Sequence, residues 1–128
     1  MGLQATTEML RVLSDPTRVR LLAVLGHEEL TVAELTGVTQ LGQSRISNHL
    51  AKLRESGFVR DRRDGKSAYY ALNLGGMSAH AARMWSATIE STSDAVLDQD
   101  RRRARELVTA RSRGMTWADA VAGQMERH

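Results

Sequence analysis

Residues 42–72 read GQSRISNHLAKLRESGFVRDRRDGKSAYYAL, and this stretch decides the fold. Its first half carries Ile46, Leu50 and Leu53, which are four and then three residues apart. That spacing places apolar side chains on one face of a helix. We therefore expect a helix over 43–56, with one face buried and the opposite face polar.

The second half of the stretch changes from helical to strand character. Gly57 suits the C-cap of the preceding helix. The residues that follow favour two strands, over 58–63 and 67–72, with Asp64-Gly65 between them. Asp-Gly is typical of a tight type I′ turn, so we expect a β-hairpin.

Three helices are predicted before this stretch. The first covers about 6–13. The second has Asp15 as N-cap and Pro16 at its first position, where the missing N–H costs nothing. The third opens with Thr31 and Glu34, the spacing of a capping box.

Further helices are predicted after the hairpin. A long one is expected over about 77–97, followed by one over 101–113 and a short one over 117–125. We divide the chain into one domain, residues 1–97, and an Arg-rich helical C-terminal extension, residues 98–128.

This order of elements is mainly α with a small β-hairpin, and it is the order of a winged helix-turn-helix. In that fold the second helix of the pair enters the major groove of DNA and the hairpin straddles the neighbouring backbone. Arg, Asn and Gln suit base edges, whereas Ser and Lys suit phosphates. The expected DNA-binding residues lie on helix 43–56 and at the hairpin tip: Gln43, Ser44, Arg45, Ser47, Asn48, Lys52, Arg62, Arg63 and Lys66.

Composition narrows the function classes. The net charge is +3, but residues 42–66 hold seven Lys and Arg against three Asp and Glu, which favours a nucleic-acid partner. The chain has no cysteine, so thiolate metal sites and disulfides are excluded. No arrangement of nucleophile, base or paired carboxylates indicates an enzyme. No apolar run approaches the roughly 18 residues of a membrane span, so we expect a cytoplasmic protein without a membrane partner.

Four motifs occur together at fixed spacing: LSDPTRVRLL at 13–22, QSRISNHLAKLR at 43–54, GFV at 57–59, and RRDGK at 62–66 leading into YYAL. Over residues 5–97 they resemble the ArsR/SmtB family of bacterial winged helix-turn-helix repressors. The resemblance implies a homodimer joined through its first and fifth helices. It also implies a double-stranded palindromic operator that the protein represses until a signal arrives.

The resemblance does not extend to the metal sites of the family. Its arsenic-type site has cysteines near the start of the third helix, where this chain has Thr31 and Ala33. Its zinc-type site uses Asp and His pairs on the fifth helix, where this chain offers His80, with Glu90 and Asp94 further on. A divalent metal needs three or four ligands. We therefore expect no metal and no cofactor, and a small molecule or a protein partner as the signal.

Two alternatives stay open at this level. The similarity of the C-terminal residues to longer regulators suggests the DNA-binding module of a protein with a methyltransferase-like domain. A metal sensor with an atypical histidine and carboxylate site is the other.

Overall fold

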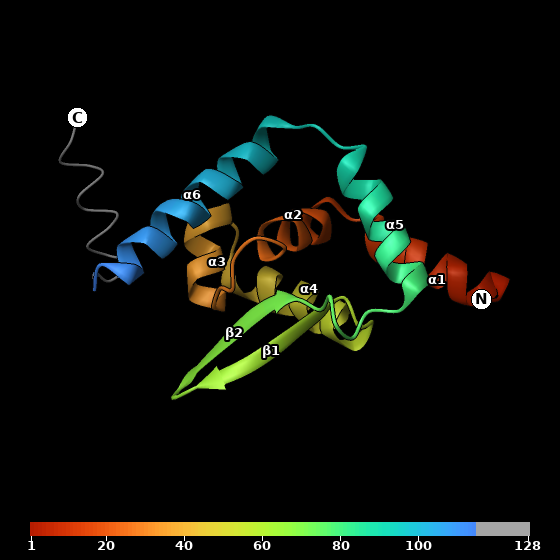
Figure 1. The fold of residues 1–128 in the computed structure, drawn as a ribbon, viewed down its shortest axis with the longest axis horizontal. Coiled ribbons are helices and arrows are strands. Elements are labelled where there is room, and N and C mark those ends of the chain that lie inside the picture. Colours follow the sequence, from red (N-terminus) through yellow and green to blue (C-terminus); the bar gives the residue numbers. More distant parts are fainter. Residues whose placement is uncertain (115–128) are drawn as a thin grey trace.

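The computed structural model describes residues 1–114, in which six helices pack together and one two-stranded hairpin projects from them (Figure 1). The predicted mainly α winged helix-turn-helix is confirmed. The helix predicted over 117–125 lies outside the described residues. The elements are α1 (Leu3–Leu13), α2 (Pro16–Leu25), α3 (Val32–Thr39), α4 (Gln43–Glu55), β1 (Val59–Asp64), β2 (Ser67–Leu72), α5 (Ala79–Glu90) and α6 (Ala95–Ser112).

The predicted helix starts at Asp15 and Thr31 are confirmed in atomic detail, whereas α1 begins at Leu3, three residues before its predicted start. The Asp15 carboxylate accepts hydrogen bonds from the N–H groups of Thr17 and Arg18, at 2.8 and 3.1 Å. The Thr31 hydroxyl accepts from the N–H of Glu34, whose carboxylate accepts from the N–H of Thr31 in return. Both arrangements satisfy N–H groups that a helix start would otherwise leave without partners.

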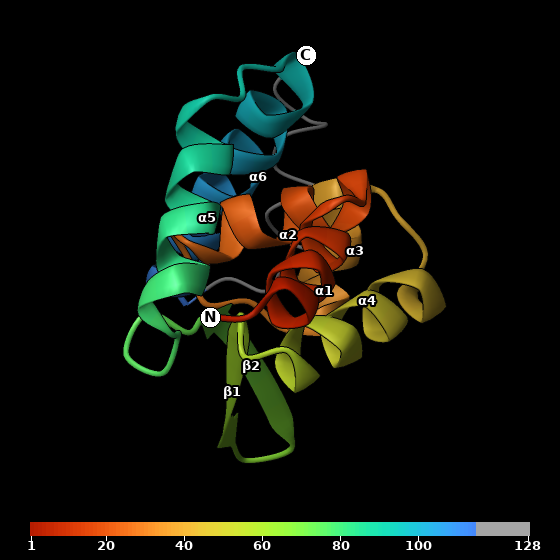
Figure 2. The same cartoon turned by 90° about the vertical axis from the view of Figure 1, so that its right-hand side faces the viewer.

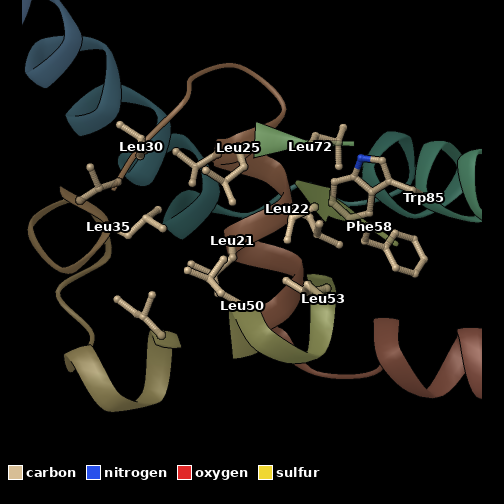
Figure 3. Packing of buried hydrophobic residues seen from close by; sticks show 14 of the residues in the cluster. Leu21, Leu22, Leu25, Leu30, Leu35, Leu50, Leu53, Phe58, Leu72 and Trp85 are labelled. Atoms are coloured by element: carbon tan, nitrogen blue, oxygen red, sulfur yellow. The ribbon is translucent and has the colours of Figure 1, made fainter. Parts of the chain in front are cut away.

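Helix α2 lies at the centre of one hydrophobic core (Figure 3). Leu21 and Leu22 are fully buried, and Leu53 of α4 and Phe58, next to β1, pack into the same cluster. Burial of each such side chain contributes roughly 1.5–3 kcal/mol. Because α4 and the hairpin share this core, the same packing positions both of them.

The hairpin turn differs from its prediction by one residue. Asp64 pairs with Ser67, so the two turn residues are Gly65 and Lys66. Gly65 has a φ of +63°, while Asp64 and Lys66 have negative φ values. A positive φ at the first turn residue alone is the pattern of a type II′ turn, which prefers glycine there, so the predicted type I′ turn was wrong.

The long helix predicted over 77–97 is also wrong, because it is interrupted at 91–94. Helix α5 ends at Glu90, and Asp94 then caps α6 by accepting a hydrogen bond from the N–H of Val96 at 2.8 Å. The intervening Ser, Thr and Asp side chains compete for backbone hydrogen bonds and favour caps over helix interiors. Helix α6 consequently begins six residues earlier than predicted and spans the expected start of the C-terminal extension.

Helix α6 packs on α2 and α3 (Figure 1). Ala104 and Leu107 enter the common core. Beside them, the Asp100 carboxylate is 2% exposed and binds the Arg20 guanidinium through two hydrogen bonds of 2.8 and 2.9 Å. Hydrogen bonding to Asp100 raises the pKa of Arg20 above its ordinary value, against the lowering effect of burial. In residues 1–114, no helix has the length and apolar content to cross a membrane.

Replacing the buried carboxylate tests this ion pair. Asp100→Ala leaves the Arg20 charge without its partner, so we expect the free energy of unfolding to fall by about 3 kcal/mol. Urea denaturation followed by circular dichroism measures the change. The matched control is Asp98→Ala, an exposed acid in the first turn of the same helix, which should cost less than about 1 kcal/mol. Equal losses in the two variants would contradict a stabilising role for the pair.

Candidate nucleic-acid interface

Helix α4 presents its polar residues to solvent as predicted. Ile46, Leu50 and Leu53 are buried against the core. The six residues of α4 that we expect to contact DNA are all exposed: Gln43, Ser44, Arg45, Ser47, Asn48 and Lys52. Their orientation agrees with the periodicity of the sequence, and their contact with DNA stays a prediction.

One of these side chains is held by α2. The Nη2 atom of Arg45 donates a hydrogen bond to the hydroxyl of Thr17 at 2.8 Å, and Thr17 is buried in the first turn of α2. A guanidinium fixed in this way loses less conformational entropy when it binds a further acceptor.

A second contact joins the start of α2 to the middle of α4. His49 lies with Nδ1 3.3 Å from the Arg18 guanidinium and Nε2 4.0 Å from the Asp15 carboxylate. Partial burial acts to raise the pKa of Asp15, but N–H donors from Arg18 and Thr17 and the charges of His49 and Arg18 together outweigh it. The pKa of Asp15 therefore lies below its ordinary 3.8, and the N-cap is ionised at neutral pH. This places His49 in a local packing contact.

The hairpin projects beyond the helices, on the side of the molecule where α4 lies (Figure 2). Arg63 and Lys66 at its tip are exposed and have no partner within residues 1–114. Arg62 differs, because its Nε donates to the Glu29 carboxylate at 2.9 Å and its guanidinium lies 4.8 Å from the centre of the Tyr69 ring. Of the three predicted hairpin cations, Arg62 is therefore paired, and Arg63 and Lys66 are unpaired within the described residues.

Three contacts fix the base of the hairpin. Leu30, in the loop between α2 and α3, exchanges two backbone hydrogen bonds with Tyr70, at 3.1 and 2.8 Å. An ion pair of 3.2 Å between Arg54 and Asp61 connects α4 to β1. An isolated two-stranded hairpin is at best marginally stable in water, so these contacts determine where its charges are held.

Several residues around the interface escaped the sequence prediction. The sequence places Glu29 in a turn, Thr17 at a helix start and Tyr69 in a strand. Nothing in the local pattern indicates that any of them contacts a predicted DNA-binding cation. Arg111 likewise lies on an element without an assigned role. Their partners are far away in sequence, and no local pattern reports such pairs.

The histidine and carboxylate side chains of the alternative metal-sensor interpretation do not form a cluster in the described residues. Across residues 1–114, no three His, Asp or Glu side chains come together in a way that suits a metal ion. His80 is exposed at the start of α5, and His49 of α4 packs against Arg18 of α2.

Comparison with known proteins identifies a matching family model and several relatives of this chain. Residues 15–61, from the α2 cap into β1, match the family model described as "Bacterial regulatory protein, arsR family". The arsenic resistance transcriptional regulator ArsR1 of Pseudomonas putida is 47% identical over 64 residues, which are 49% of this chain and 50% of that protein. The chain thus spans about half the length of the curated relatives that it matches.

Solved structures share the fold over a longer stretch. The transcriptional repressor BigR from Xylella fastidiosa is 32% identical with a TM-score of 0.55, over 70% of this chain and 89% of that one. A homodimeric winged helix-turn-helix DNA-binding domain from Mycobacterium bovis has a TM-score of 0.58 at 23% identity, over 69% and 78% of the two chains. The names of these relatives describe regulators and DNA-binding proteins, not enzymes. The motifs, the fold and these matches together show that the chain belongs to the arsR family of bacterial regulatory proteins.

Proposed function

We propose that this chain is a sequence-specific transcriptional repressor that binds double-stranded DNA as a homodimer. The observation that carries the proposal is the exposed polar face of α4 beside a hairpin with free cations at its tip. Base edges in the major groove are read by side chains near the start of a recognition helix, and phosphates are bound by cations on either side.

The residues divide into two roles. Arg45 and Asn48 are assigned to base edges, because Arg pairs with guanine and Asn with adenine through two hydrogen bonds each. Gln43 is a second candidate for a base edge. The remaining side chains are assigned to phosphates or to the minor groove: Ser44, Ser47, Lys52, Arg62, Arg63 and Lys66.

Two substitutions separate these roles. Asn48→Ala should lower affinity for the operator by about 1–3 kcal/mol and leave affinity for random duplex unchanged. Lys66→Ala should weaken both by similar factors and reduce the slope of log affinity against log salt by about one. Fluorescence anisotropy compares DNA from upstream of the protein's own gene, where we expect a palindromic operator, with a shuffled duplex.

The charge-matched control is Arg102→Ala, an exposed α6 residue without a partner in the described part of the chain. It should change neither quantity by more than about twofold. Equal affinity of the wild type for the operator and the shuffled duplex would overturn the proposed function.

Helix α1 supports the dimer. Leu3 and Leu10, two turns apart on α1, are 82% and 52% exposed, and α5 packs beside this helix (Figure 2). Exposed leucines on one helix face are typical of an interaction surface. The Mycobacterium bovis domain with the same fold is a homodimer. We assign α1 and α5 to the dimer interface.

Sedimentation velocity tests the interface. The wild type should sediment as a dimer, and Leu10→Glu should shift it to monomer, because the interface would have to bury an unpaired charge. The control Leu74→Glu alters a leucine that is 72% exposed in the turn before α5, and it should stay dimeric. A monomeric wild type, or a dimeric Leu10→Glu, would contradict this interface.

We propose a small organic molecule as the signal that releases the operator. The chain has no cysteine for a thiolate site. A groove of about 600 Å³ between α1 and α4 combines apolar Met9, Val12 and Phe58 with the cations Arg11 and Arg18, among other lining residues. Such a lining suits a ligand with an apolar body and polar groups. Because the groove borders α4, a bound ligand would act directly on the recognition helix.

Thermal-shift screening tests the signal. A metabolite that raises the melting temperature should also lower operator affinity, and Met9→Trp, which fills the groove, should abolish both responses. Zn²⁺, Ni²⁺ and other divalent metals should leave melting temperature and operator affinity unchanged. A metal response that EDTA reverses would overturn the proposal in favour of a metal sensor.

A further inference from the structure

Helix α6 lies outside residues 15–61, where the family model matches, yet it contacts α3 at both of its ends. Asp100, Arg103, Leu107 and Arg111 are three, four and four residues apart, a spacing that keeps side chains on one helix face. Leu107 enters the core, Asp100 binds Arg20 of α2, and the two arginines contact the end of α3 and the loop before it.

The first of these contacts is at the end of α3. Arg103 donates a hydrogen bond to the Val38 carbonyl at 3.3 Å, and Arg20, held by Asp100, donates to the Thr39 carbonyl at 2.8 Å. The last carbonyls of a helix have no partner within the helix. Gln40 follows directly with a φ of +63°, and this is the turn that leads into α4. Helix α6 therefore supports the turn of the helix-turn-helix.

The second set of contacts is at the start of α3 and involves Arg111. Its Nε lies 2.9 Å from the Glu34 carboxylate, an ion pair in which the N–H is not directed at the oxygen. Its Nη2 donates a hydrogen bond to the Glu29 carbonyl at 2.8 Å. Arg111 thus holds the capping box of α3 and the loop that precedes it.

Arg111 also reaches the hairpin. Its guanidinium carbon lies 5.5 Å from the centre of the Tyr69 ring, the same ring that Arg62 contacts at 4.8 Å. The carboxylate of Glu29 binds Arg62, while the carbonyl of Glu29 accepts from Arg111. The adjacent Leu30 carries the backbone bridge to β2. The position of a predicted DNA-contacting cation therefore depends on a residue in the last turn of α6.

We propose that α6 is a brace that holds the helix-turn-helix turn and the hairpin in their DNA-reading arrangement, with Arg111 as the positioning residue for the hairpin. The consequence for DNA rests on the proposed function, whereas the consequence for the hairpin in the free protein does not. Arg111 itself needs no contact with DNA: it acts through Glu29, Tyr69 and Arg62.

The test compares two variants that lose the same charge from the same helix. Arg111→Met keeps an unbranched apolar stem and removes the guanidinium. Arg105→Met is the matched control, because Arg105 is exposed and has no partner within residues 1–114. Hydrogen exchange of residues 58–73 is measured in the free protein, with α2 as internal reference. Affinity for operator and for shuffled duplex is measured across a range of salt concentrations.

Arg111→Met should speed exchange in the hairpin by about tenfold and leave exchange in α2 unchanged, because only local opening becomes easier. It should weaken operator binding by about tenfold, the effect of one misplaced charged contact. Shuffled-duplex affinity should fall by a similar factor, because the displaced hairpin cations are assigned to phosphates, whereas Arg105→Met should change both affinities by no more than about twofold. Arg111→Lys, which keeps the charge without the planar guanidinium, should fall between the wild type and Arg111→Met.

Three outcomes would overturn the proposed role of α6. They are equal hydrogen exchange and DNA affinity in Arg111→Met and Arg105→Met, faster hydrogen exchange in α2 and the hairpin alike, and unchanged hydrogen exchange in the hairpin. If Arg111→Met fails to fold, Arg111→Lys carries the same comparison. If the wild type shows no preference for an operator, the proposed function fails, and hydrogen exchange still decides whether α6 fixes the hairpin.

Discussion

The pair formed by Arg20 and Asp100 is the interaction on which the arrangement of helices depends most. It places a carboxylate that is 2% exposed against a guanidinium from α2, 80 residues earlier in the chain. Burying either charge alone would cost several kcal/mol, so each requires the other in a narrow geometry. The Arg20 guanidinium also donates to the Thr39 carbonyl, so a single pair fixes α2, the end of α3 and α6. Hydrophobic packing alone, which is not directional, would leave the rotation of α6 less defined.

The hairpin shows how carboxylates compete with DNA for the same cation. Arg62 contacts both Glu29 and the Tyr69 ring in the free protein, whereas Arg63 and Lys66 have no partner in the described residues. A phosphate that binds Arg62 has to displace or share the Glu29 carboxylate, which lowers the gain from that contact. A rearrangement that loosens Glu29 would release Arg62 from this carboxylate, and it would also remove the support by which Arg111 positions the hairpin. The loop before α3 is thus positioned to adjust the affinity of the hairpin without touching DNA.

The sequence predicts correctly those features that depend on residues close together in the chain. The caps at Asp15 and Thr31 act between residues two or three apart, and both were predicted correctly. The outward face of α4 followed from the spacing of Ile46, Leu50 and Leu53. The turn shifted by one residue because Gly65 suits both the second position of a type I′ turn and the first position of a type II′ turn, and pairing with the opposite strand decides between them. The break after Glu90 was missed because Thr92 and Val96 continue the helical spacing, although Asp94 and the preceding polar residues favour a cap.

The contacts that could not be predicted are those that join distant segments. Residues 98–113 hold six arginines and three acids, a composition that favours either a solvated helix or a DNA-binding one. The structure divides these arginines by the face on which they lie. Arg103 binds a carbonyl at the end of α3 and Arg111 binds one in the loop before α3, while Arg102 and Arg105 are exposed. Charge counted along the sequence cannot separate the two groups, because the separation depends on where α6 begins and on the rotation that the Asp100 pair imposes. A basic segment near a DNA-binding domain can therefore position that domain through its buried face without itself contacting a phosphate.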